Sequence, residues 1–330
     1  MNKIFITGAT GYIGHQLSKK LLEQGNELHL LIRKKNDDPL FQNRSVKLFY
    51  GDITDEQSVR EAVKGCGQVY HVAAMAKLWS KDPSLFYEVN VRGTANVLRE
   101  AFNTGVKKIV YTSSTAVSGT APERITKEDD PRLDSFKSDY DLSKQLAENL
   151  INEYVSKGMH CVIVRPSRVY GPGPITYSNF FCREIISALK KKYAIIPYAK
   201  NVIANYAFIE DVTDGHIGAM KSGRAGEKYI LGGENITYDT LLSYLKQYLK
   251  KVVFIPATKP FIMLASYKEV LKSNITSREP ELIPAAVKRY FTNAAFSCDK
   301  AKNQLGYTIT PFKIGMEKTI NYLKNLYNEK

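Results

Sequence analysis

The sequence predicts an α/β protein built on a doubly wound parallel sheet, followed by a smaller mixed α/β part. Three observations support this prediction. A glycine-rich turn joins an apolar strand to an amphipathic helix within the first 25 residues, and short β-rich runs then alternate with helical periodicity as far as residue 165. Beyond residue 165 the alternation weakens, and helices are interleaved with short strands.

Composition indicates a globular chain with a large core. Of its 330 residues, 44% are hydrophobic and 24% are charged, without repeats or low-complexity tracts. The four cysteines, Cys66, Cys161, Cys182 and Cys298, are widely separated and form no zinc-ligand spacing, so we expect no metal site. The amino-terminal residues do not resemble a secretion signal, and no apolar run approaches the roughly 18 residues that span a bilayer. We expect a cytoplasmic protein without membrane insertion.

The net charge of +14 is unevenly distributed along the chain. Residues 1–165 hold 23 Lys and Arg against 20 Asp and Glu, whereas residues 166–330 hold 24 against 13. A basic second half suits an anionic substrate, a nucleic acid or a membrane surface, or it consists of solvated lysines that keep the chain in solution. Because no nucleic-acid motif accompanies the charge, we expect no nucleic-acid partner.

The first glycine-rich turn is typical of a dinucleotide site. It lies between a strand at 3–7 and a helix that ends near Gly25. Gly8 permits a tight turn, Gly11 lets a pyrophosphate approach the backbone, and Gly14 allows the helix to pack closely on the strand. The spacing is GxxGxxG rather than the commoner GxGxxG, and such turns also occur for steric reasons alone.

The next strands indicate where the rest of a nucleotide would lie. The strand at 27–32 ends in Arg33, at the place where NAD-selective sites usually hold an acid, so we expect NADP(H) in preference to NAD(H). An exposed loop cation is the alternative. After a strand at 46–50, Asp52 either hydrogen-bonds the adenine edge or caps a helix at 55–64. A strand at 69–72 ends in Ala73 and Ala74, whose small side chains would let a cofactor lie against the backbone.

Candidate catalytic groups follow the next β-α-β unit, a helix at 84–104 and a strand at 108–112. Ser114 follows this strand and could hydrogen-bond a substrate carbonyl, although serines are also common in turns. A helix at 138–155 carries Tyr140 and Lys144 on one face, one turn apart. A nearby cation favours the phenolate and lowers its pKa, so the pair could exchange a proton with a carbonyl or alcohol oxygen. A surface helix that happens to carry both residues is the alternative.

The second half contains fewer clear motifs. We expect helices at 179–192, 211–221, 237–249 and 312–326, with short strands at 206–209 and 228–231. Trp79, Tyr170, Tyr177, Phe180 and Phe208 are candidates for apolar walls of a substrate pocket, and each could equally belong to the core.

Taken together, the motifs resemble the extended short-chain dehydrogenases/reductases, the NAD-dependent epimerase/dehydratase family. They are TGATGYIG at 7–14, GDITD at 51–55, HVAA at 71–74, YTSS at 111–114, YDLSK at 140–144 and RPSRVYGPG at 165–173. The resemblance implies a Rossmann domain at 1–165 and a mostly substrate-binding region at 166–330, with some segments returning to the Rossmann sheet. It also implies a homodimer that pairs through the helices at 84–104 and 138–155.

Functional residues also follow from this resemblance. Ser114, Tyr140 and Lys144 would be catalytic, with Ser114 preferred over Ser113 and with Lys144 also binding the nicotinamide ribose. Asn90 would lie near the active site, or it would be an asparagine tied to the backbone within its helix. The implied cofactor contacts are Thr7, Gly8, Thr10, Gly11, Tyr12, Ile13, Gly14, Arg33, Asp52, Ile53, Ala73, Ala74, Tyr140, Lys144 and Pro166.

Three features favour one branch of this family. Ser114 is followed by Thr115-Ala116 rather than the Asp-Glu of sugar-nucleotide dehydratases, Val117-Ser118-Gly119 replaces the VYG of many epimerases, and Arg33 favours NADP. The chain is most similar to the dihydroflavonol-reductase-like group, which implies reversible NADPH-dependent reduction of a ketone or aldehyde. A nucleoside-diphosphate-sugar epimerase with tightly bound NAD is the alternative, and an NADP-sensing regulator is a minor one.

Overall fold

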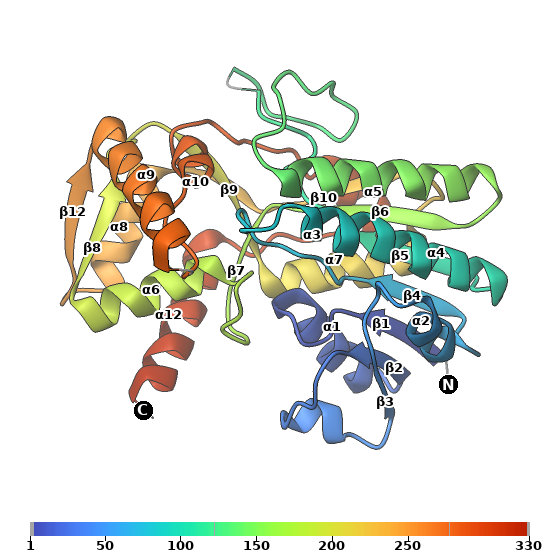
Figure 1. Ribbon diagram of the computed structural model, residues 1–330. Coiled ribbons are helices and arrows are strands. Elements are labelled where there is room, and N and C mark those ends of the chain that lie inside the picture. The colour runs from blue at the N-terminus through green and yellow to red at the C-terminus, as the bar shows by residue number, and fades with distance from the viewer. Residues whose placement is uncertain (1–2, 122, 277, 329–330) are drawn as a thin grey trace.

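The fold consists of a large parallel sheet wrapped by helices and a smaller part beside its carboxyl edge (Figure 1). This computed structural model describes residues 3–121, 123–276 and 278–328. The described residues form a seven-stranded parallel sheet in the order β10-β6-β5-β4-β1-β2-β3. Its strands are β1 (Lys3–Thr7), β2 (Glu27–Ile32), β3 (Val46–Tyr50), β4 (Gln68–His71), β5 (Lys108–Thr112), β6 (Cys161–Pro166) and β10 (Lys228–Leu231). The predicted fold class is confirmed.

The strand order reverses at β1, which pairs with β2 on one side and with β4 on the other. The chain first builds outward from β1 to β3 and then returns to place β4 beside β1. In open parallel sheets a crevice forms at such a reversal, beyond the carboxyl ends of the strands. The segments that follow β1 and β4 therefore lie next to each other at the expected nucleotide site.

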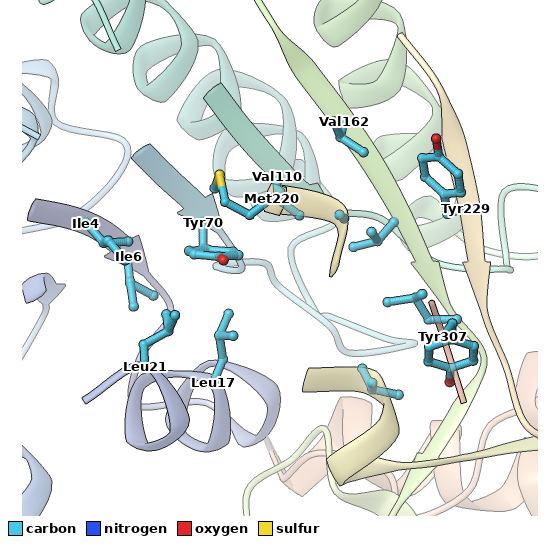
Figure 2. Packing of buried hydrophobic residues seen from close by; sticks show 14 of the residues in the cluster. Ile4, Ile6, Leu17, Leu21, Tyr70, Val110, Val162, Met220, Tyr229 and Tyr307 are labelled. Atoms are coloured by element: carbon cyan, nitrogen blue, oxygen red, sulfur yellow. The ribbon is translucent and has the colours of Figure 1, made fainter. Parts of the chain in front are cut away.

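Helices cover both faces of the sheet, which explains why its strands are almost continuously apolar. One face packs against α1 (Tyr12–Glu23) and α7 (Ile209–Ser222), and Figure 2 shows Ile4 and Ile6 of β1 near Leu17 and Leu21 of α1. The other face packs against α2 (Glu56–Val63), α4 (Gly93–Asn103) and α5 (Asp139–Ser156). Because the sheet is packed between these helices, the loops that follow its strands are held at fixed positions.

The helix expected at 84–104 is present but interrupted. It comprises α3 (Ser84–Tyr87), a π-helical turn at Glu88–Arg92 and α4. Asn90 lies in the π turn, where its amide oxygen accepts from the Met75 backbone N–H at 2.7 Å and its amide nitrogen donates to Ser143 Oγ at 2.9 Å. The π turn therefore places the Asn90 side chain between Met75, which follows β4, and Ser143 of α5. Such turns often occur at functional sites.

The smaller part contains two short sheets among the described residues. One has the order β11-β9-β7, from β11 (Glu234–Thr237), β9 (Ile203–Phe208) and β7 (Arg168–Tyr170), and the other pairs β12 (Val253–Ala257) with β8 (Tyr193–Pro197). Helices α6 (Phe180–Lys191), α8 (Tyr238–Tyr248) and α12 (Phe312–Asn328) surround a core that includes Tyr170 and Phe208. These two aromatic residues are therefore core residues rather than pocket walls.

Several elements of the second half were not predicted. They are α9 (Lys259–Thr276), α10 (Pro284–Tyr290), α11 (Asp299–Leu305) and strands β7, β8, β11 and β12. The strand at 228–231 joins the edge of the large sheet as β10, and α7 packs beneath that sheet. The division of the chain near residue 165 stays a prediction. Among the helices of the described chain, none combines the length and apolar content needed to cross a membrane.

Candidate active site

The glycine turn forms a close junction between β1, α1 and the end of β4. Gly8 has a φ of +79°, and a Cβ there would lie 2.6 Å from the Ala73 nitrogen. A Cβ on Gly14 would lie 2.2 Å from the Gly8 carbonyl oxygen, and one on Gly11 would lie 3.2 Å from the same oxygen. A side chain at Gly8 or Gly14 would therefore clash with the backbone. The absence of a side chain at Gly11 leaves the backbone of the turn accessible. The backbone here matches the role expected of a pyrophosphate cradle.

No side chain of the described residues caps the backbone N–H groups at the amino end of α1. Gly11 caps the helix without a side-chain hydrogen bond, and the first turn, all of it within the described chain, contains no acidic residue. Thr10 is exposed at the turn and Ile13 is half-buried. Free N–H groups and the positive end of the helix dipole favour a phosphate at this point. The turn therefore fits a dinucleotide on geometry and on charge.

Two predicted contact residues direct their side chains inward instead. The Thr7 hydroxyl lies 2.7 Å from His71 Nδ1 and accepts from the Ala73 N–H at 3.1 Å. The Tyr12 hydroxyl donates to the Gly171 carbonyl at 2.7 Å. These side chains tie the turn to β4 and to the loop after β7, so any contact of Thr7 and Tyr12 with a cofactor would come from the backbone.

Arg33 and Asp52 lie after neighbouring strands at the same edge of the sheet. Arg33 is exposed, and no other described residue forms a hydrogen bond or ion pair with it. Asp52 Oδ1 accepts from the Thr54 N–H and hydroxyl, both at 2.9 Å. Asp52 is not the cap of α2, because Asp55 caps that helix through Gln57 and Ser58. The capping alternative for Asp52 is therefore wrong.

The remaining predicted contacts follow the central strands. Ala73 and Ala74 are half-buried after β4, next to Gly8. Ile53 is buried, and its carbonyl accepts from the Asn96 amide at 2.9 Å. Pro166 ends β6, and its carbonyl accepts from the Thr115 N–H at 3.1 Å. The structure thus brings segments from β1, β3, β4 and β6 to one edge.

The two candidate serines have different environments. Ser113 is buried and donates from its hydroxyl to Glu148 Oε1 at 2.6 Å. Ser114 is half-buried, accepts from the Ala116 N–H at 3.1 Å and lines an open pocket. Since the Ser113 hydroxyl is already committed to a carboxylate, this geometry supports Ser114 as the residue that faces a substrate.

Tyr140 is half-buried in the first turn of α5, close to Ser114. Burial raises the pKa of its phenol, while a hydrogen bond with Ser114 and the positive charge of Arg289 act in the opposite direction. The phenol is therefore protonated at neutral pH, and the raised pKa makes it a weaker acid than a free tyrosine. Its hydrogen bond with Ser114, rather than its acidity, places a proton donor beside the pocket.

Lys144 does not act on Tyr140 as the sequence argument expected. Its ammonium is fully buried, donates to the Thr112 carbonyl at 2.6 Å and lies 4.3 Å from the centre of the Tyr111 ring. Burial lowers the pKa of Lys144 to about 7, with Glu148 acting to raise it. The expected lowering of the Tyr140 pKa by Lys144 is absent in this structure, and Arg289 is the cation that acts on the phenol.

Arg289 and Arg168 are site residues that the sequence analysis missed. Arg289, in the last turn of α10, pairs with the buried Asp141 carboxylate beside Tyr140. Arg168, in β7, donates to the Tyr238 hydroxyl at 3.1 Å and to the Arg289 carbonyl at 3.2 Å. No carboxylate of the described residues forms an ion pair with Arg168. The unpredicted helix α10 brings Arg289 to the site, so no local motif could have revealed that residue, whereas Arg168 lies within the RPSRVYGPG motif and was not singled out there.

The pocket contains more cationic than acidic side chains. Its lining includes four cationic side chains and two carboxylates: Arg132, Lys137, Arg168, Arg289, Asp134 and Asp141. Ser167 also lines it, with a buried hydroxyl that has no hydrogen-bond partner in the described chain. Over the described ranges, no group of three or more His, Cys, Asp or Glu is arranged to hold a metal ion.

Asn90 links the site to its surroundings. Its amide group bridges Met75, after β4, and Ser143, whose hydroxyl donates to the Tyr140 carbonyl at 2.9 Å. Both the oxygen and the nitrogen of this amide are thus bonded to other parts of the protein. The alternative of an asparagine tied to backbone therefore fits better, with the bond running to another segment rather than to its own helix.

Comparison with known proteins agrees with this geometry. The profile of the NAD dependent epimerase/dehydratase family matches residues 4–232. The chain belongs to this family and is an NAD(P)-dependent enzyme of the extended short-chain dehydrogenase/reductase type. The family assignment made from the motifs is confirmed.

The chain is also similar to individual proteins of different activities. It is 29% identical to the "Putative dihydroflavonol 4-reductase" of Synechocystis sp., over 97% of this chain and 94% of that protein. It is 30% identical to sterol demethylase protein B of Methylococcus capsulatus, over 73% of each protein. The Thermus thermophilus UDP-glucose 4-epimerase structure superposes with a TM-score of 0.78 at 24% identity, over 98% of this chain and 99% of that one, which shows a shared fold.

Proposed function

We propose that the protein uses NADPH to reduce a ketone or aldehyde group of a small molecule, in a reversible reaction. The observation that carries this proposal is the half-buried Tyr140, whose side chain is hydrogen-bonded to Ser114 at the edge of a pocket that contains several charged side chains. Ser114 would donate a hydrogen bond to the carbonyl oxygen, and Tyr140 would give it a proton. Bound NADPH supplies the hydride that reaches the carbonyl carbon. Lys144 would hold the nicotinamide ribose from the floor of the site.

The charge of the pocket supports a substrate that bears an acidic group. Arg168 is a half-buried cation without a carboxylate partner in the described chain, whereas the Arg289 guanidinium beside it is paired with Asp141. A guanidinium binds a carboxylate or phosphate with two parallel hydrogen bonds. Keto acids are therefore the first carbonyl compounds to screen, by the loss of NADPH absorbance.

The test of this proposal is Tyr140→Phe. The variant keeps the ring but loses the proton donor, so we expect turnover of the best screened substrate to fall by about 100-fold or more while the Kd for NADPH stays unchanged. Tyr154→Phe, at the far end of α5, is the matched control. Wild-type turnover in Tyr140→Phe would exclude Tyr140 as the acid.

A sugar-nucleotide epimerase is the second candidate, because the cationic pocket also suits a diphosphate and the fold matches a UDP-glucose 4-epimerase. The two functions differ in how they treat the cofactor. A reductase must exchange its nucleotide in every cycle, whereas an epimerase regenerates it in place. Denaturing the purified protein and identifying the released nucleotide, together with exchange against added NADPH, distinguishes them. Tightly held NAD that does not exchange would favour the epimerase.

An NADP-sensing regulator is the minor alternative. It would require that Tyr140→Phe leave the biological effect of the protein intact.

A further inference from the structure

Helix α9 of the smaller part (Figure 1, orange) carries a stripe of large apolar side chains that are exposed. The α9 stripe consists of Phe261, Leu264, Tyr267, Leu271 and Ile275, which are 61%, 57%, 53%, 64% and 85% exposed. They recur every three or four residues and therefore lie on one face of the helix. A surface helix normally turns such a face toward the core, so the orientation of α9 needs an explanation.

The buried side of α9 is small and partly polar. Ile262, Ser266 and Ser273 are its buried residues, and Ser273 has a buried hydroxyl without a partner among the described residues. Ile262 packs with Val287 of α10. The amphipathic pattern is thus reversed, with serines facing the protein and large apolar residues facing solvent.

The charges beside the α9 stripe are positive. Lys268 and Lys272 are exposed one turn apart along it, and neither forms an ion pair within the part of the chain that the structure describes. The helix has one acidic residue, Glu269, whose position lies toward the Ile262 side and which is only half-exposed. An apolar stripe flanked by unpaired lysines is typical of helices that lie in the interface of a membrane.

We propose that α9 docks in the plane of an anionic lipid surface, with the α9 stripe in the headgroup layer and the two lysines on lipid phosphates. A second copy of this chain fits less well, because face-to-face pairing would bring these lysines together without carboxylates to neutralise them. The two-stranded sheet at the same end of the molecule exposes four further apolar residues: Tyr193, Ile195, Val253 and Ile255.

Docking through α9 would place the pocket near the lipid. Helix α10 packs against α9 and ends in the turn that contributes Arg289 to the pocket. The Glu279 carboxylate, just after α9, pairs with Lys77 in the loop that follows β4. The docking surface therefore belongs to the same region that surrounds the substrate site.

The test is sedimentation of the full chain with vesicles. We expect the wild type to bind vesicles of phosphatidylcholine with about 30% phosphatidylglycerol, and to bind pure phosphatidylcholine at least tenfold more weakly. The double variant Leu264→Gln/Leu271→Gln should lose this binding by about tenfold or more. Leu133→Gln, which changes a residue that is 66% exposed elsewhere, should bind like the wild type.

Charge and oligomeric state provide the remaining outcomes. Lys268→Glu/Lys272→Glu should weaken binding to the anionic vesicles, whereas Lys19→Glu on α1 should not. Light scattering of the same proteins gives their masses in solution. The proposal is overturned if the wild type ignores anionic vesicles, if the Leu264/Leu271 variant binds them as well as the wild type does, or if that variant converts a dimer into a monomer.

Discussion

Arg33 is the residue on which the choice between NADPH and NADH depends in our proposal. Its guanidinium is exposed just after β2, with no partner among the described residues, and is free to bind a ribose 2′-phosphate. Arg33→Asp would replace this phosphate contact with an acid suited to a 2′-hydroxyl. We expect the ratio of the Kd for NADH to that for NADPH to fall by at least about tenfold, as measured by fluorescence titration.

The matched control is Arg44→Asp, which makes the same charge change before the amino end of β3, away from the carboxyl edge of the sheet. Arg33 is only a surface cation if Arg33→Asp leaves the ratio of the two Kd values unchanged. The same conclusion holds if Arg44→Asp changes this ratio as much as Arg33→Asp does.

Single residues also show which parts of the site a sequence can predict. Ser114, Tyr140 and Lys144 could be proposed from the sequence because each lies in a short local pattern at a strand end or on one helix face. Arg289 lies far along the chain, and its charge reaches Tyr140 only because α10 folds beside α5. The direction of the Tyr140 pKa was wrong for the same reason, since burial depends on tertiary packing.

A buried ion pair links α5 to β6 beneath the site. Arg165 Nη2 and Nε lie 2.6 and 2.9 Å from the two Glu148 carboxylate oxygens, and both residues are less than 5% exposed. Glu148 also accepts from Ser113, next to Ser114. Removing one partner leaves a buried charge, so we expect Glu148→Met or Arg165→Met alone to destabilise the protein by roughly 3–5 kcal/mol.

The double variant Glu148→Met/Arg165→Met removes both charges of this pair and should recover much of that loss. Urea unfolding of the four proteins measures the coupling between the two side chains. If the free energies lost in the two single variants add up to the loss in the double variant, Glu148 and Arg165 do not stabilise each other. The nucleotide-bound and nucleotide-free forms should be measured separately, because a bound ligand adds its own stability.

Element prediction succeeded where the hydrophobic pattern was strong. Six strands of the large sheet, β1 to β5 and β10, are largely apolar runs with turn residues at their ends, and their positions were predicted within one residue, whereas β6 was not predicted as a strand. Helix α9 was missed because apolar residues lie on both its buried and its exposed sides, which weakens the helical periodicity of its sequence. The π turn at Glu88–Arg92 was missed because it depends on Asn90 bonding to distant segments.

At the scale of the whole molecule, two buried histidines should make the fold sensitive to acid. His71 lies between Thr7 and Thr94, and His216 lies between Thr112 and the Val212 carbonyl. Burial lowers the pKa of His71 to about 3 and that of His216 to about 4. Between these values and about 6.5 the unfolded chain binds more protons than the folded one, so stability falls as pH decreases through this window.

His216 allows this effect to be separated from the titration of carboxylates. Its neutral imidazole contributes on the order of 3 kcal/mol of pH-dependent stability between pH 7 and pH 4. His216→Gln should lower the Tm at pH 7, because a buried contact is disturbed, but its Tm should then fall less than that of the wild type between pH 7 and pH 4.5. His160→Gln, at a half-buried histidine that lies 3.0 Å from the Gly223 carbonyl, controls for the loss of a histidine as such. Parallel Tm curves for His216→Gln and the wild type would mean that other groups, such as the Asp55 and Asp134 carboxyls with their lowered pKa values, carry the acid sensitivity of the fold.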